Sequence, residues 1–486
     1  MAEESVQALA YAVRPRVVAK YIAQVGLMLA ALTTVPLAVA ITTGHDAFTA
    51  RLAAVLVVLL AVGALSRLPA PERIQTNEAL AVTALAFILA PLLMSYPLMA
   101  GGLAFGDALF EAVSALTTTG LTTVTGMQER PAAFVFLRAW MQWYGGLGIV
   151  VLSVALLMGH STAARRLAEP ATTGETVVAT TRTHARRVLA VYLLLTGVAV
   201  AALWPVAGDG FTALAHGLTA ISTGGFATHD ASLAALPRPA APVALAVALL
   251  GAVSLPLYYR TWAQGWRAAW TDPELRGLVT AVVLVAALTA LFAAGAGLDG
   301  PEALWHGVLV GISAQTGTGF TTIEPPSLGN AALLVLIAAM LAGGSIGSTT
   351  GGIRILRLLI LLKLLRWSLQ RTAVPSHAVL TPRLGGRTLE TDDLLRALLL
   401  AALFATLVLV SWLAFLAHGY APLPALFEVA SAVGTVGLTA GITRAELEPA
   451  LKAVLCFDMV AGRLEVIALL VVLYPRTWLG KRGSMR

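Results

Sequence analysis

Long apolar runs, separated by short polar or glycine-rich connections, make up most of this chain. A helix needs about 20 apolar residues to cross the ~30 Å hydrocarbon core of a bilayer. Ten runs approach or exceed that length: 21–42, 52–67, 77–99, 132–158, 187–207, 240–259, 277–297, 330–365, 393–417 and 448–474. The pattern predicts an all-α polytopic membrane protein.

Shorter apolar segments lie between successive runs from residue 77 onward and cannot cross a bilayer. They are residues 105–116, 210–221, 301–315 and 421–432. Each is predicted to be a short helix that leads into a decamer rich in glycine and hydroxyl residues. Irregular backbone at membrane depth is tolerated only where it is buried in protein or lines water. Each unit therefore consists of a span, a pore helix, an irregular segment and a second span. This order predicts four re-entrant pore loops around one central pore.

The decamers share one register, in residues 114–123, 219–228, 313–322 and 431–440. Each places one glycine at the same offset: Gly120, Gly225, Gly319 and Gly437. These glycines recur at intervals of about 95 to 120 residues, which indicates an internal repeat. One copy alone would be interpreted as an external turn between helices. Four copies in register, each after a short helix, favour the pore loop.

The repeats divide the chain into an N-terminal helix pair, residues 1–72, and four pore repeats. The predicted repeats are residues 73–165, 166–272, 273–372 and 373–486. The first apolar run has an alternative interpretation as a signal peptide, because basic residues precede it and Ala38, Val39 and Ala40 form a possible cleavage motif. A second apolar run follows at once, which favours a helical hairpin.

Composition and charge agree with a membrane protein. The chain is 58% hydrophobic and only 12% charged. Lys and Arg gather in alternate connections, whereas the connections that hold the decamers are acidic by comparison. By the positive-inside rule, both termini are expected in the cytoplasm and the protein in the cell inner (plasma) membrane. The net charge of +7 thus reflects topology, and no nucleic-acid partner is expected.

The decamers indicate cation selection by backbone oxygens. Carbonyl groups that face a pore can replace the hydration shell of K⁺. Successive carbonyls point the same way only where some residues adopt left-handed dihedrals, which glycine does at little cost. The pore helices add the partial negative charge of their C-terminal ends. The candidate K⁺ ligands are Thr118, Thr119, Gly120, Thr223, Gly224, Gly225, Gly317, Thr318, Gly319, Thr435, Val436 and Gly437.

With these repeats and span count, the chain resembles the Trk/Ktr/HKT superfamily of potassium transporters, and its TrkH-like pore-forming subunits in particular. The closest local matches are residues 143–148, 343–352 and 462–465. The resemblance implies K⁺ uptake, a homodimer in membrane lipid, and a cytoplasmic ring of TrkA-like RCK-domain regulatory subunits. It implies K⁺ ions in the filter and no covalently bound cofactor.

Ion preference has two interpretations. In plant members of the superfamily, a serine in place of the first filter glycine accompanies sodium transport, so Gly120 favours K⁺. The second and fourth filters read Gly-Gly-Phe and Val-Gly-Leu, which makes the ring uneven. A Na⁺-preferring or weakly selective transporter of the same fold is therefore the alternative. Channel-like flux and H⁺- or Na⁺-coupled flux both stay open.

A glycine-rich stretch interrupts the run 330–365. Each glycine in a helix costs about 1 kcal/mol relative to alanine, which predicts an unwound loop at the inner pore mouth. The superfamily uses this loop as an intramembrane gate, here Gly343, Gly344, Ser345, Gly347, Ser348, Thr349, Thr350, Gly351 and Gly352. The alternative is a helix-packing seam, because three of these glycines are spaced by four. The following Arg354, Arg357, Lys363 and Arg366 are expected to emerge into the cytoplasm.

Two arginines occupy apolar runs, where a charge is costly and faces a partner or a pathway. Within the predicted helix 448–474, Arg463 either pairs with Asp458 or Glu465, or places a fixed positive charge below the filter. The resemblance implies the second role. Arg138, near the outer start of its run, is expected to anchor pore-helix residues such as Glu111.

Other classes of protein fit less well. A polytopic transferase would need clustered Asp, Glu and His at one membrane face, and the histidines are scattered. His216 and His306, in the pore helices, are expected to form hydrogen bonds there. KdpA, another fourfold potassium carrier, is a closer rival. The longest predicted cytoplasmic stretch, residues 366–392, is too short for a nucleotide-binding domain, so nucleotide regulation would need a separate protein.

Overall fold

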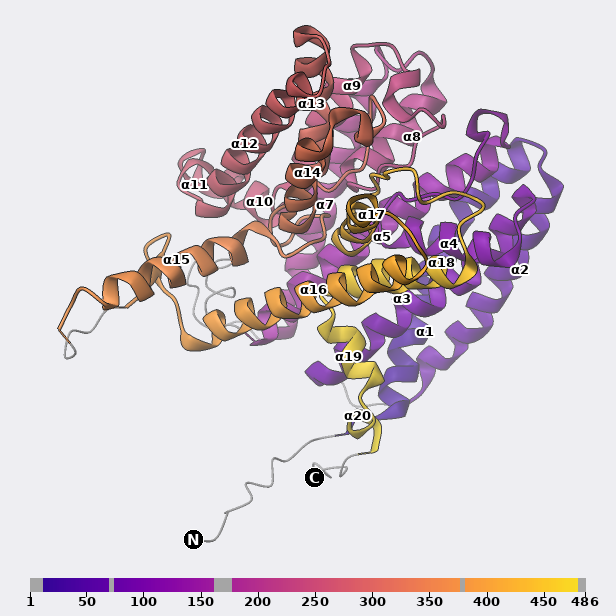
Figure 1. Cartoon of the computed structure of the whole chain (residues 1–486). Coiled ribbons are helices and arrows are strands. Elements are labelled where there is room, and N and C mark those ends of the chain that lie inside the picture. Colours follow the sequence, from indigo (N-terminus) through magenta and orange to yellow (C-terminus); the bar gives the residue numbers. More distant parts are fainter. Residues whose placement is uncertain (1–11, 70–73, 161–176, 376–380, 480–486) are drawn as a thin grey trace.

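The computed structural model describes residues 12–69, 74–160, 177–375 and 381–479 (Figure 1). In this part of the chain the only strands are β1 (Arg383–Leu384) and β2 (Arg387–Thr388), a small antiparallel pair. Everything else with regular structure is helical. The prediction of an all-α polytopic fold is confirmed.

The N-terminal pair consists of α1 (Pro15–Thr42) and α2 (Asp46–Gly63), followed by the 3₁₀ helix η1 (Ala64–Arg67). The two helices pack against each other beside α3 (Figure 1). An ion pair fixes the start of α1 to α3, because Nε of Arg14 lies 2.6 Å from Oε1 of Glu78. The amide of Val13 also donates to the carbonyl of Thr477, 2.8 Å away, which joins the two ends of the described chain.

Each of the four repeats begins with a long helix and continues with a short one. The long helices are α3 (Thr76–Leu98), α7 (Val177–Leu203), α12 (Pro273–Gly295) and α16 (Thr391–Ala417). The short helices are α4 (Phe105–Leu116), α8 (Gly210–Ile221), α13 (Gly300–Gln315) and α17 (Pro422–Gly434). Their bounds agree with the predicted pore helices to within two residues. Local signals fix their starts: the Asp209 carboxylate caps α8, and proline occupies the first turn of α13 and α17.

The second span of each repeat follows its decamer. These spans are α5 (Ala132–His160), α9 with α10 (Ala240–Ala252, Leu255–Gln264), α14 with α15 (Asn330–Ala342, Ile355–Arg371) and α18 with α19 (Pro449–Arg463, Ile467–Leu473). The part of the chain that the structure describes also has the short helices α11 (Arg267–Trp270) and α20 (Arg476–Leu479). Four 3₁₀ turns lie in the connections: η2 (Met99–Gly101), η3 (Met127–Glu129), η4 (Ser232–Ala235) and η5 (Pro325–Leu328).

Three of the second spans are broken at corresponding places. The break between α14 and α15 was predicted. The predicted span 240–259 is bent, since α9 and α10 meet at 80°, and the predicted helix 448–474 is interrupted, since α18 ends at Arg463. In repeat two, carbonyls near the bend accept hydrogen bonds from the residue 343–352 loop, from Ser345 N to Ala252 O (3.0 Å) and from Thr349 N to Gly251 O (3.2 Å). In repeat four, the φ angles of 55° and 61° at Glu465 and Val466 end the helix.

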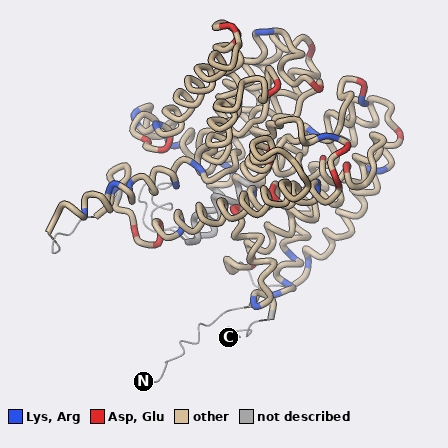
Figure 2. The backbone as a smooth tube through the Cα atoms, viewed as in Figure 1, with Lys and Arg blue, Asp and Glu red and all other residues tan. Residues whose placement is uncertain are grey.

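The helices have the character of membrane spans. In the described part of the chain, six helices are long and apolar enough to cross a bilayer. The number is seven if the bent pair α9–α10 counts as one span. The number is below the ten predicted runs partly because α14–α15 and α18–α19 are broken. Most charged residues lie at helix ends and in connections, while the helix middles are largely uncharged (Figure 2). The chain is a multi-pass membrane protein.

Candidate cation pathway

The four decamers close into a ring. A Cβ added to any of the shared glycines would collide with a carbonyl oxygen of the next repeat. That carbonyl belongs to the residue just before the shared glycine of the next repeat. The pairs are Gly120 with Gly224, Gly225 with Thr318, Gly319 with Val436, and Gly437 with Thr119. The fourth repeat thus returns to the first. The four segments surround one axis, and their carbonyls lie at the contacts between repeats.

The backbone of this ring alternates in handedness. The shared glycines have φ angles of 90°, 76°, 81° and 96° in repeats one to four. Two residues earlier φ is positive again, at Thr118 (54°), Thr223 (50°), Gly317 (65°) and Thr435 (50°). Left-handed dihedrals were predicted for the glycines but not for the three threonines. A non-glycine residue held there stores strain of ~1–3 kcal/mol, and such strain is concentrated at functional sites.

Side chains at the pore-helix ends hold the ring segments. The amide of Gly120 donates to Oγ of Ser114 (3.1 Å), and the amide of Gly437 donates to Oγ of Ser431 (3.0 Å). The hydroxyl of Thr118 and that of Thr435 are buried without a hydrogen-bond partner in the described structure. Buried polar atoms are rarely left unsatisfied, so these two oxygens are available to a ligand.

Behind the ring of repeat one, Arg138 anchors the pore helix as predicted. Its Nε donates to Oε2 of Glu111 at 2.8 Å, and its guanidinium lies 3.7 Å from the centroid of the Phe226 ring. The other carboxylate oxygen of Glu111 accepts from the amide of Thr123 at 2.9 Å. Arg138 therefore joins α4 to the ring segment of repeat two.

Repeat four has a counterpart that the sequence analysis did not identify. Glu428, like Glu111, stands nine residues before the shared glycine. Its Oε1 accepts from the amides of Ile442 (2.9 Å) and Thr443 (2.8 Å), just beyond the ring. The common offset of the two glutamates was the available signal.

The loop at residues 343–352 lies against one end of the ring. Three consecutive loop residues touch three segments of the ring, and each contact is made two residues before the shared glycine. Thr349 Oγ1 lies 3.1 Å from Thr223 Oγ1, a Cβ on Gly317 would lie 3.8 Å from Cβ of Thr350, and a Cβ on Gly351 would collide with the hydroxyl of Thr435. The loop therefore contacts the ring segments of repeats two, three and four at that end.

Hydroxyl groups also hold the loop to itself and to repeat two. Oγ of Ser348 donates to the carbonyl of Ser345 (2.6 Å), and the amide of Gly344 donates to Oγ1 of Thr350 (3.2 Å). The hydroxyl of Thr349 lies 3.1 Å from the Gly251 carbonyl oxygen. The amide of Ile346 adds a bond to the carboxylate of Glu274, 2.6 Å away.

Arg463 contacts the loop and not an acidic partner. Its Nη1 donates to the carbonyl of Thr349 at 2.7 Å, and the side chain is buried. Asp458 instead accepts from Oγ of Ser411 (2.6 Å), and Glu465 pairs with Arg354 and Arg357. The interpretation of Arg463 as half of an ion pair with Asp458 or Glu465 is wrong. In the described structure, Nε and Nη2 of Arg463 have no hydrogen-bond partner.

The basic stretch after the loop begins inside the protein. Arg354 was expected to emerge at the surface, but its side chain is 2% exposed and lies 3.2 Å from Glu465. Arg357 reaches the same carboxylate at 2.5 Å. A break in the fourth repeat supplies this glutamate, which is why a pattern of apolar runs could not reveal the pair. Arg366 further along α15 is exposed.

The two pore-helix histidines form the expected hydrogen bonds. Nδ1 of His216 lies 3.0 Å from the Thr212 carbonyl oxygen, and Nδ1 of His306 lies 2.8 Å from Oγ1 of Thr322. No group of three or more His, Cys, Asp and Glu residues that could hold a metal ion occurs where the structure describes the chain. The candidate ligands are the carbonyl oxygens of the ring and the unpartnered hydroxyls of Thr118 and Thr435.

Comparisons with known proteins identify the family of this chain. The profile of the TrkH family, described as a cation transport protein, matches residues 49–477. The chain belongs to the TrkH family. The Trk system potassium uptake protein TrkH of Escherichia coli (strain K12) is 32% identical over 387 residues, which are 76% of this chain and 79% of that protein. The Trk system potassium uptake protein TrkI of Halomonas elongata is 30% identical over 482 residues, 94% and 96% of the two chains.

A solved member of the TrkH family has the same fold. The crystal structure of the potassium transporter TrkH from Vibrio parahaemolyticus superposes with a TM-score of 0.84 at 26% identity, covering 96% of this chain and 100% of that one. The resemblance drawn from the repeats is therefore confirmed. The family is one of transporters and not of enzymes.

Proposed function

We propose that this chain takes up K⁺ across the cell inner (plasma) membrane, through one pore lined by its four decamers. The observation that carries the proposal is the closed ring of shared glycines and neighbouring carbonyls. A dehydrated K⁺ ion needs a ring of oxygens, and a fourfold arrangement of carbonyls supplies one. The TrkH and TrkI relatives carry the name of potassium uptake proteins.

The filter ligands follow from this arrangement. Carbonyl oxygens of the residues before the shared glycines form one layer, and the unpartnered hydroxyls of Thr118 and Thr435 contribute at the end facing the loop. The C-terminal ends of four pore helices direct partial negative charge to the same place. Bound K⁺ is thus the transported ion, held by the twelve residues at and before the shared glycines.

The loop at residues 343–352 is the gate in this proposal. It contacts three of the four ring segments at one end of the ring, and in this proposal it must move before an ion can leave the filter. The charge of Arg463, hydrogen-bonded to the loop, adds an electrostatic barrier to a cation at the same level. Both termini face the cytoplasm, where α15 and α16 extend together beside the pore (Figure 1). A TrkA-like RCK-domain ring acts on these inner helix ends, and the pore subunit is a homodimer.

Flux measurements on the purified protein in liposomes test the proposal. K⁺-loaded liposomes should accumulate tracer Rb⁺, and external K⁺ should suppress the uptake far more than external Na⁺ does. Equal suppression by Na⁺ would favour the alternative of a weakly selective or Na⁺-preferring transporter. No uptake in the presence or absence of a cytoplasmic partner would contradict the proposed function.

A further inference from the structure

We propose that Gln142 is a positioning residue for the second filter segment, and that its amide replaces a side chain that Gly224 lacks. This inference rests on the proposed filter and extends it to ion preference. Gln142 lies on α5, in the second span of repeat one, and is fully buried. It therefore acts across a repeat boundary.

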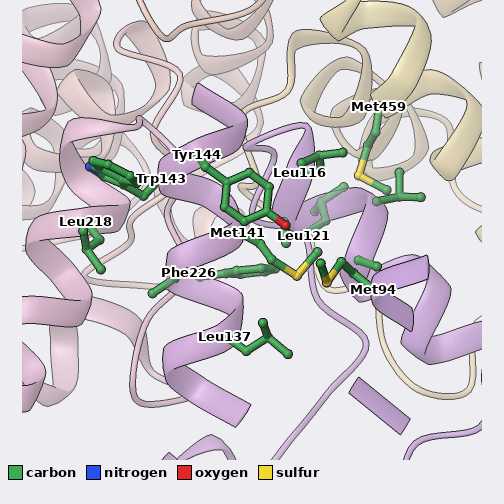
Figure 3. Packing of buried hydrophobic residues seen from close by; sticks show 14 of the residues in the cluster. Met94, Leu116, Leu121, Leu137, Met141, Trp143, Tyr144, Leu218, Phe226 and Met459 are labelled. Carbon is green, nitrogen blue, oxygen red and sulfur yellow. The ribbon is translucent and has the colours of Figure 1, made fainter. Parts of the chain in front are cut away.

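Both ends of the Gln142 amide bind the backbone on either side of Gly225. Nε2 donates to the carbonyl of Gly224 at 2.6 Å, and Oε1 accepts from the amide of Phe226 at 3.1 Å. Figure 3 shows the Phe226 ring beside Met141, the residue that precedes Gln142 on α5. Apolar packing thus brings the second filter segment against α5, and the amide fixes its register.

Gly224 stands where each of the other repeats has a buried side chain. Thr119 and Thr318 each place the hydroxyl 2.8 Å from a threonine two residues earlier, and Val436 lies in an apolar cluster. A Cβ on Gly224 would collide with the amide of Gln142. Gly224 is absent from the residues with positive φ, so its backbone conformation would accept a side chain. The Gln142 amide fills the volume which that side chain would need.

The corresponding positions of the other repeats cannot play this part. The residues 22 positions after the shared glycine are Val247, Leu341 and Met459, which carry no side-chain amide. Gly224 and Gly225 are adjacent glycines, so no side chain constrains the backbone at these two positions. The backbone at these two positions is therefore held by the two hydrogen bonds from Gln142.

The consequence is a role in ion preference. The Gly224 carbonyl that Gln142 binds is also the oxygen that lies against Gly120 in the ring. Loss of the amide frees this carbonyl to rotate, and discrimination between K⁺ and Na⁺ depends on the number and placement of such carbonyls. A merely structural role would lower the amount of folded protein without changing the ratio of the two ions transported.

The test measures the K⁺ to Na⁺ uptake ratio in liposomes containing Gln142→Leu, Gly224→Thr, or the double variant Gln142→Ala with Gly224→Thr. Gln142→Leu should lower the ratio about tenfold, the effect of losing one or two net hydrogen bonds from the favoured state. Gly224→Thr alone should also impair selective uptake, because its side chain meets Gln142. The double variant should recover the ratio, since threonine then takes the place it has in repeats one and three.

The control is Met459→Leu, which changes a buried side chain at the corresponding position of repeat four and should keep the ratio. If Gln142→Leu gives no folded protein, Gln142→Glu replaces it, since glutamate loses the donor to Gly224 at nearly constant shape. A selective wild type with an unchanged ratio in the Gln142 variant would overturn this inference and leave the proposed function standing. If the double variant has an uptake ratio no higher than that of Gly224→Thr, the Gln142 amide does not replace the missing side chain of Gly224. A wild type without K⁺ preference would overturn both proposals.

Discussion

Arg463 donates a hydrogen bond from Nη1 to the main-chain carbonyl of Thr349 at 2.7 Å, and so joins the broken second span of repeat four to the loop of repeat three. The hydroxyl of the same Thr349 lies 3.1 Å from that of Thr223 in the second filter segment. One loop residue thus links a buried positive charge to the filter. The loop and Arg463 are expected to act together on a passing cation.

Replacing Arg463 by alanine should raise K⁺ flux, by about tenfold or more, while the protein stays folded. The change removes a positive charge from the pathway, and repulsion of ~4 kcal/mol between unit charges 4 Å apart at an effective dielectric constant of 20 exceeds a tenfold effect. Liposome flux and size-exclusion chromatography measure the two properties. Arg463→Lys retains the charge and serves as the control. A joint fall in folded protein and flux would assign Arg463 to structure alone.

Deleting residues 345–350 should open the pore without a partner. The deletion removes the loop residues that touch Thr223 and Gly317, together with the bond from Arg463 to Thr349. We expect high K⁺ flux that no longer responds to a cytoplasmic nucleotide-binding subunit. Low flux that still depends on the partner would favour the packing-seam interpretation of these glycines, and the gate would then lie elsewhere.

The buried pair Arg138–Glu111 should contribute to stability chiefly as a pair. Arg138→Leu leaves Glu111 buried without its cation, which typically costs about 3–5 kcal/mol, and should lower the thermal unfolding midpoint in detergent. Adding Glu111→Gln should recover part of that loss, because the uncompensated charge is gone. Equal midpoints for the single and double variants would show that the arginine acts through its packing on Phe226.

The sequence predicted features that each repeat carries within itself. The pore-helix bounds and the shared glycines follow from apolar periodicity and composition, and so does the interruption at residues 343–352. The bend at Ala252 and the break after Arg463 did not, because each is stabilised by partners from another repeat. For Ala252 the partner is Ser345, and Glu465, beyond the second break, pairs with Arg354.

The contacts of Gln142 and the left-handed dihedrals of the threonines were not predicted, for a similar reason. Gln142 binds residues that are more than 80 positions away in the sequence, and no local sequence pattern indicates such a contact. Thr118 holds a φ of 54° that threonine does not favour, so local propensity argues against the observed backbone. Packing within the ring overrides that propensity. The short-range signals therefore located the four segments that meet in the ring, while the detailed backbone of the ring depends on the assembled fold.

We propose that four segments of one chain form one selective ring, and the K⁺ to Na⁺ uptake ratio of four glycine variants measures what each segment contributes. Liposomes would carry Gly120→Ser, Gly225→Ser, Gly319→Ser or Gly437→Ser, with Gly197→Ala on α7 as the control because nothing lies within 4 Å of its added Cβ. Each serine would collide with a carbonyl of the neighbouring repeat, so all four variants should lose the K⁺ preference or the uptake itself, whereas the control should keep both. Unchanged uptake and selectivity in any one of the four would remove that segment from the ring and contradict the account.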